Sequence, residues 1–160
     1  MKDEKELFNS LEGYNNYEDH LFEQYRIIVN SSQQITDYRQ KANVFFITVH
    51  AAIFGLLGTL LKSEVVLWFL VLPSVGILLC ILWRAILKSY KELNSGKFKV
   101  IHEIEKKLPL RLFGYEWEVL GRGKNSDIYT PTTTTELYIT WVFMAIHFFV
   151  FVGISIDVFS

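Results

Sequence analysis

The feature that most constrains this chain is a pair of apolar stretches separated by only three residues. Residues 43–61 and 65–83 contain no Asp, Glu, Lys or Arg. As α-helix, a stretch of this length is about 28 Å long, enough to cross the hydrocarbon core of a bilayer. Lys62, Ser63 and Glu64 between them allow a reversal between antiparallel helices but not a domain. We therefore predict a transmembrane helical hairpin over residues 43–83.

A third apolar stretch lies near the C-terminus. Residues 137–156 again contain no Asp, Glu, Lys or Arg, and they predict a third membrane helix over 136–158. The preceding Thr133-Thr134-Thr135-Glu136 matches a capping box, in which Thr and Glu side chains satisfy free N–H groups at a helix start. The 160 residues are 51% hydrophobic and 21% charged, so the two kinds of residue must be segregated along the chain.

The distribution of Lys and Arg predicts which side of the membrane each segment occupies. Five precede Asn43, one lies at Lys62, ten lie between Arg84 and Glu136, and none follows. The positive-inside rule then places the N-terminus and residues 84–135 in the cytoplasm. Three crossings that start inside must end outside, so we expect a periplasmic or extracellular C-terminus. The net charge of −1 indicates no nucleic-acid partner.

Both helices of the hairpin are expected to continue into the cytoplasm. Neither Pro nor Gly occurs from Glu18 to Phe54, and apolar residues from Leu21 onward recur at helical spacing. The second helix is expected to pass Gly96 and to end at Pro109. The two extensions would lie side by side as a stalk, whose apolar stripes one pair of helices cannot hide completely.

These observations predict an all-α membrane protein with three transmembrane helices. Its first two helices form a tight hairpin extended into a cytoplasmic helical stalk, and a small irregular cytoplasmic segment precedes the third. The predicted parts are a cytoplasmic N-terminal helix region (1–42), the hairpin (43–83), a stalk helix with a loop segment (84–135) and the third transmembrane helix (136–158). Residues 109–132 are compatible with a short strand or with packing on the stalk.

Small residues in the hairpin are candidates for helix packing, because small faces let membrane helices approach closely. They are Ala51, Gly55, Gly58, Ser74 and Gly76. This packing fits either the two helices of one hairpin or neighbouring subunits. Pro73 lies in the middle of the second membrane helix and is a candidate hinge, although a static kink is the simpler interpretation.

Two histidines lie inside apolar helices. Counted from the cytoplasmic ends, His50 and His147 lie at similar depth, so they are a candidate intramembrane polar pair. Ionisable groups inside a membrane are functional candidates, yet an interhelical hydrogen bond satisfies a neutral histidine without any further role. A structural pair is the simpler hypothesis, and a proton relay is the alternative.

Basic residues near the membrane and in one loop are candidate contacts for anionic lipid or for an anionic ligand: Arg84, Lys88, Arg122 and Lys124. Gly121-Arg122-Gly123-Lys124 lacks both the first Gly and the Ser or Thr after Lys that a nucleotide-hydrolysis loop requires. No catalytic constellation and no Cys/His cluster typical of a metal site occurs, and Cys80 is the only cysteine. We expect no cofactor, no metal and no enzymatic activity.

Several unusual short sequence motifs indicate a resemblance to a known family. These are Arg39-Gln40-Lys41-Ala42-Asn43, Leu82-Trp83-Arg84, Leu93-Asn94-Ser95, Lys97-Phe98-Lys99-Val100-Ile101-His102-Glu103 and Glu116-Trp117. With them, residues 20–150 resemble the RipA-like family of small bacterial octameric inner-membrane proteins. The resemblance implies a homo-oligomeric assembly, of eight subunits, in the bacterial inner membrane. It carries no activity over to individual residues.

Three functions are compatible with this reading. The first is a non-enzymatic structural or channel-like assembly of several copies in contact with anionic headgroups. The second, by analogy with other small membrane proteins, is a gated effector of bacterial anti-phage defence that answers a cytoplasmic nucleotide or protein signal through Arg122 and Lys124. The third is a small transporter or intramembrane enzyme that uses His50 and His147.

Overall fold

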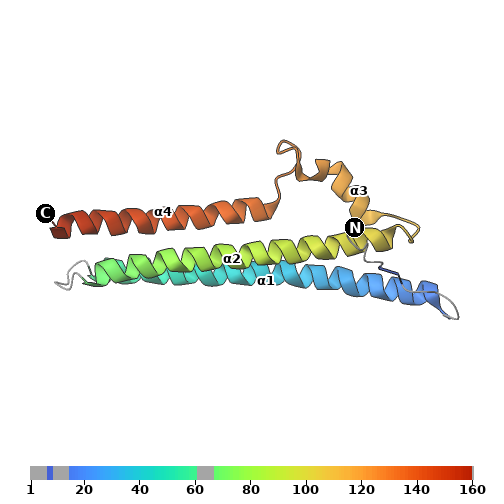
Figure 1. Ribbon diagram of the computed structural model, residues 1–160, viewed down its shortest axis with the longest axis horizontal. Helices are drawn as coiled ribbons and strands as arrows, with labels where there is room; N and C mark the ends of the chain where they lie inside the picture. The colour runs from blue at the N-terminus through green and yellow to red at the C-terminus, as the bar shows by residue number, and fades with distance from the viewer. Residues whose placement is uncertain (1–6, 9–14, 61–66, 160) are drawn as a thin grey trace, which may run out of the picture. The chain divides into compact units, whose positions relative to one another are not determined.

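The protein is all-α in the part that its computed structural model describes, residues 7–8, 15–60 and 67–159. Four helices and one 3₁₀ turn follow one another along these residues, and no strand occurs among them. The elements are α1 (Tyr17–Leu60), α2 (Leu67–Glu105), α3 (Leu112–Val119), the turn η1 (Gly121–Gly123) and α4 (Thr132–Phe159), as Figure 1 shows. The predicted reversal at 62–64 and the C-terminal Ser160 lie outside the described residues.

Helix α1 is one unbroken helix of 44 residues. It continues because no Pro or Gly interrupts its first three-quarters, and Glu18 and Asp19 complement the partial positive charge of its N-terminal end. The predicted apolar stripe is its inner face, since Leu21 and Ser32 are buried while Phe22, one position away from Leu21, is exposed.

Helix α2 is also continuous, over 39 residues. It passes through Gly96 as expected and contains Pro73, which is fully buried. The helix ends at Glu105, four residues before Pro109, because the turn formed by Lys107 and Leu108 bonding back to Ile104 and Glu105 has already closed it.

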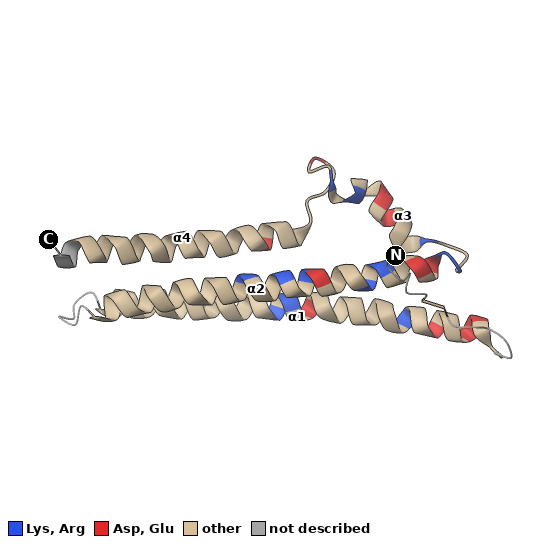
Figure 2. Ribbon diagram, viewed as in Figure 1, with Lys and Arg blue, Asp and Glu red and all other residues tan. Residues whose placement is uncertain are grey.

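Three of the described helices are long and apolar enough to cross a membrane: α1, α2 and α4. The predicted number of membrane helices is therefore confirmed. Figure 2 shows the corresponding charge pattern, with α4 almost free of charged residues along its length and the charges of α2 gathered in its C-terminal part. The chain is an all-α protein that spans the membrane with three helices.

The chain divides into two compact units. The membrane unit consists of residues 37–91 and 131–160, and the second unit consists of residues 1–36 and 92–130. The core of the membrane unit is formed by Phe46, Trp83 and Leu87, which are buried, with partly buried side chains of α4 packed against them. The rings of Phe46 and Trp83 stack with centroids 5.6 Å apart.

The contacts within the membrane unit determine the direction of its three helices. Along α1, Arg39 meets Glu136 and His50 meets His147, so α1 and α4 run in parallel. Asn43 meets Trp83 and His50 meets Cys80, so α2 is antiparallel to α1.

The segment before α4 that was predicted to be irregular belongs to the second unit. Its residues form the short helix α3 and the turn η1, neither of which the sequence pattern distinguished from a short strand. The ring of Phe113 packs edge-on against that of Phe98 of α2, with centroids 5.7 Å apart. Among the described residues of this unit, the buried apolar side chains are those of Leu21, Ile101 and Ile104.

Candidate functional site

A polar cluster joins α1 to the beginning of α4 in the membrane unit. The guanidinium of Arg39 lies 3.1 Å from Oε2 of Glu136, and another of its nitrogens donates a hydrogen bond of 2.7 Å to Oγ1 of Thr133. Both partners of the ion pair are nearly buried, with 13% and 10% of their side chains exposed. The residues of the expected capping box therefore bond to α1, and α4 begins at Thr132, before the expected cap at Thr133.

A second set of contacts joins α2 to the same region. The indole N–H of Trp83 donates to Oδ1 of Asn43 at 2.9 Å, and Arg84 donates to the carbonyl of Leu137 at 3.0 Å. The guanidinium of Arg84 also lies 4.8 Å from the ring centre of Trp141, a cation–π contact. We call Arg39, Asn43, Trp83, Arg84, Thr133 and Glu136 the boundary cluster, because they lie where the apolar stretches begin or end.

Deeper in the apolar stretches, one line of side chains connects all three helices. Nδ1 of His50 on α1 lies 2.9 Å from Nε2 of His147 on α4, and Nε2 of His50 lies 3.5 Å from the sulfur of Cys80 on α2. All three residues are fully buried. We call them the His–Cys line. The two predicted histidines are thus hydrogen-bonded to each other, and Cys80 is a partner that the sequence did not indicate.

The His–Cys line is compatible with either direction of its hydrogen bonds. If His50 donates to His147, the other nitrogen of His50 accepts the Cys80 thiol proton. If His147 donates instead, that nitrogen of His50 carries a proton and donates to the sulfur. Both arrangements keep both hydrogen bonds.

A notch in α2 accommodates His147. A Cβ atom at Gly76 would lie 2.3 to 2.5 Å from three atoms of the His147 ring, far closer than real contacts allow. Gly76 is therefore needed for the ring to lie against α2. The remaining ring nitrogen, Nδ1 of His147, is buried and makes no hydrogen bond in the described part of the chain.

The other small residues predicted for packing lie elsewhere. Ala51, Gly55 and Gly58 are exposed on α1, and no atom lies within 4 Å of where a Cβ would stand at either glycine. Ser74 is half-buried and its hydroxyl donates to the carbonyl of Leu70. In the single chain, the open small face therefore belongs to α1, and the closely packed glycine is Gly76.

The second unit is organised by the carboxylate of Glu105, which is 1% exposed. One of its oxygens accepts from the Phe113 N–H at 2.8 Å and from the Tyr25 hydroxyl at 3.1 Å, and the other accepts from the Gly114 N–H at 2.9 Å. Burial, together with Glu105 as acceptor and as a charge, raises the pKa of Tyr25 to about 12, so its phenol stays protonated and donates. Glu105 thus caps α3, which has no side-chain cap of its own.

The basic loop after α3 is an unusual left-handed turn. Gly121, Arg122 and Gly123 all have positive φ, between 54° and 63°, which glycine adopts easily and arginine does not. The Arg122 guanidinium pairs with Glu118 at 3.4 Å, and Glu118 also lies 3.8 Å from Arg111. Lys124 is exposed, and the other predicted basic contact, Lys88, is exposed on α2 of the membrane unit.

The chain is similar to a known family of membrane proteins over most of its length. No curated protein and no solved structure matches the chain. Residues 22–156 match the model of the octameric membrane protein family, and this range covers α2 and α3 and most of α1 and α4. This match extends over far more than half of the 160 residues. The chain therefore belongs to the octameric membrane protein family.

Proposed function

We propose that this chain builds a homo-oligomeric assembly in the bacterial inner membrane, with a structural or channel-like role and no enzymatic activity. The observation that carries the proposal is the open small face of α1. Gly55 and Gly58 have empty space beside their α-carbons in the single chain. Membrane helices with such faces gain van der Waals contact by associating closely, and the family is octameric by name.

The polar groups of the spans support a scaffold role. The boundary cluster and the His–Cys line use their polar atoms to hold α1, α2 and α4 together. A rigid three-helix subunit is what an assembly of repeated copies requires. The charge distribution supports a cytoplasmic N-terminus and a periplasmic C-terminus, with Arg84 and Lys88 near anionic headgroups.

The experiment replaces both open glycines of α1 by leucine and measures the mass of the detergent-solubilised particle. Gly55→Leu with Gly58→Leu is expected to reduce the particle to smaller species. Gly153→Leu is the matched control, because Gly153 on α4 is also exposed with open space beside it. A wild-type particle that is monomeric would end the proposal. Ion conductance of the purified particle in planar bilayers separates a channel-like role from a structural one.

A second candidate function, proton transport along the His–Cys line, is favoured by the linear arrangement of its groups. With a proton on both nitrogens, His50 donates to His147 and to Cys80, so no hydrogen bond is lost when the line takes up a proton. The surrounding apolar stretches contribute no Asp, Glu, Lys or Arg.

Proton flux into vesicles that contain the purified protein tests this second candidate. His50→Leu and His147→Leu are expected to abolish the flux, and His102→Gln in the second unit is the control. Equal flux through the wild type and both variants would rule out the relay.

A further inference from the structure

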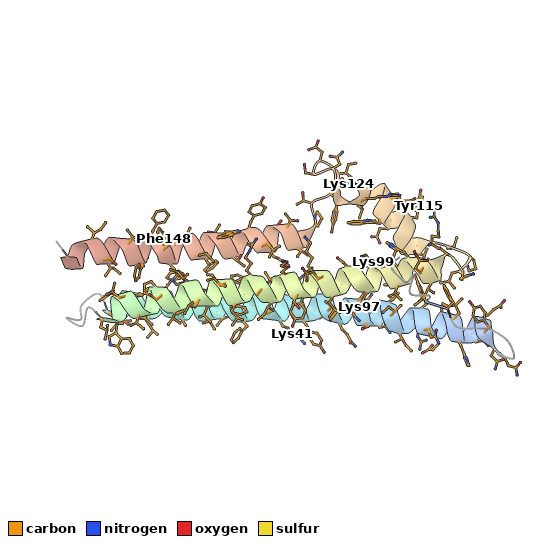
Figure 3. The ribbon with its side chains drawn as sticks, in the orientation of Figure 1. Lys41, Lys97, Lys99, Tyr115, Lys124 and Phe148 are labelled. Carbon is orange, nitrogen blue, oxygen red and sulfur yellow. The ribbon has the colours of Figure 1, made fainter. Side chains whose placement is uncertain are left out.

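Helix α3 presents an unpartnered apolar surface that is held in a defined position. It has no buried residue, and large apolar side chains on one of its faces and beside it are 56% to 67% exposed: Leu110, Leu112, Tyr115, Val119 and Ile128. We call these five residues the α3 patch. Figure 3 shows Tyr115 on α3. The capping by Glu105 and the contact between Phe113 and Phe98 hold the helix in place while leaving this surface uncovered.

A second exposed surface without a partner lies on α2 of the same unit. Leu93 on α2 is 50% exposed, and beside Gly96 no atom lies within 4 Å of where a Cβ would stand. A glycine inside an exposed helix costs about 1 kcal/mol relative to alanine, and a close approach by another group is a common reason for it. We call Leu93 and Gly96 the α2 shelf. Lys99, which Figure 3 labels on the same helix, is also exposed.

The two surfaces lie on different sides of the unit. At 100° per residue, Leu93 lies about 140° around α2 from Phe98, the residue against which α3 packs. The α3 patch of one copy therefore cannot cover the α2 shelf of that same copy. Two different surfaces on each subunit are what a head-to-tail interface requires, and such an interface forms a ring where the rotation between copies closes.

The charges near the α3 patch and the α2 shelf favour a second copy of this chain as the partner of the α3 patch. Residues 110–128, which contain the α3 patch, have three basic and three acidic side chains and therefore no net positive charge, and the acidic Glu116 lies on α3 itself. Helices that lie on anionic lipid are basic, so a membrane surface fits the α3 patch poorly. The α2 helix beside the shelf carries exposed Lys99, which suits the acidic residues of α3. The family supplies neighbouring copies, and its match includes both surfaces.

We propose that the α3 patch of each subunit docks onto the α2 shelf of the next copy in a head-to-tail ring. This inference rests on the self-association proposed above and names the surfaces that carry it outside the membrane. The side chain of Tyr115 lies in the space beside Gly96, and Glu116 lies near Lys99 of the neighbouring subunit.

Cysteine crosslinking in native membranes tests this contact. A chain with both Tyr115→Cys and Gly96→Cys is expected to give a ladder of multimers with a bismaleimide reagent, whereas each single variant gives none. The unmodified chain is a built-in control, since its only cysteine, Cys80, is fully buried. Tyr115→Cys paired with Asn30→Cys, an exposed position on α1, is the matched control and is expected to give no ladder.

The mass of the solubilised double variant separates the two proposals. A multimeric particle without a ladder, or a ladder of equal strength from the control pair, would overturn the docking of α3 while self-association stands. A monomeric wild-type particle would overturn both. Both substituted side-chain positions are open in the single chain, so the variants are expected to retain wild-type helix content.

Discussion

Nδ1 of His50 and Nε2 of His147 lie 2.9 Å apart, although 97 residues separate them in the sequence. The contact joins the first and the last of the three membrane helices, and Cys80 extends it to the middle one. Inside an apolar environment a hydrogen-bonding group without a partner is costly, so each histidine stabilises the position of the other. The pair is therefore a determinant of how α1 and α4 pack, whatever further role it has.

The two single histidine variants are expected to lose, in sum, more unfolding free energy than the double variant loses. His50→Leu leaves Nε2 of His147 without its partner, and we expect it to lower the free energy of unfolding by about 1–3 kcal/mol. The double variant His50→Leu/His147→Leu removes both polar groups and is expected to lose less than the sum of the two single losses. Unfolding in detergent, monitored by helix content, measures the wild type, the two single variants and the double variant. Strictly additive losses would show that the two rings do not interact.

Gly76→Ala is expected to disturb the same contact without touching either histidine. The added methyl group would stand 2.3 Å from the His147 ring, so the ring or the helix must move, at a cost of about 1–3 kcal/mol. Gly153→Ala is the control, because space is open there and alanine favours a helix. Thermal unfolding of the two variants measures the difference. The prediction fails if Gly76→Ala is as stable as Gly153→Ala.

The membrane helices could be predicted from sequence because one-dimensional signals determine them. The charge-free runs and the absence of Pro and Gly from Glu18 to Phe54 are enough to predict spans and an unbroken α1. The contact between Arg39 and Glu136 could not be predicted in this way. It depends on the register of α4 against α1, and the sequence pattern contains no signal for that register.

Helix α3 was unpredictable for a different reason. An eight-residue helix that contains Gly114 is too short to be stable alone, so its existence depends on a cap from elsewhere in the fold. That cap is the carboxylate of Glu105, seven residues before Leu112, and Gly114 permits the approach because a Cβ there would stand only 3.2 Å from its Oε2. No signal in the sequence pattern marks Glu105 as this cap, because the contact depends on how α3 folds back onto the end of α2.

The ion pair of Arg39 and Glu136 is expected to be worth far more than the surface pairs of the same chain. Breaking a nearly buried pair leaves one charge uncompensated, so Glu136→Gln is expected to cost about 3 kcal/mol of unfolding free energy. Glu23→Gln, which breaks the exposed pair with Arg26, is expected to cost less than about 1 kcal/mol. Denaturant unfolding in detergent compares them. Equal losses would show that the boundary pair does not lock α1 to α4.

Glu105 is expected to control the order of α3 without affecting the membrane helices. In Glu105→Ala, the N–H groups of Phe113 and Gly114 lose their acceptors and Tyr25 loses its partner. Because α3 depends on this cap, we expect amide hydrogen exchange over residues 113–119 to become at least tenfold faster, which corresponds to about 1.4 kcal/mol or more. Exchange in α4 is expected to stay unchanged.

Two controls make this last measurement specific. Glu103→Ala removes an exposed carboxylate two residues away, which pairs only with Lys106 among the ion pairs of the described residues, and it is expected to leave exchange in α3 as in the wild type. Tyr25→Phe removes one hydrogen bond from Glu105 but keeps both backbone contacts, so its effect is expected to lie between the two. If exchange over 113–119 were the same in Glu105→Ala and Glu103→Ala, the carboxylate of Glu105 would not be what holds α3, and the position of the α3 patch would need another cause.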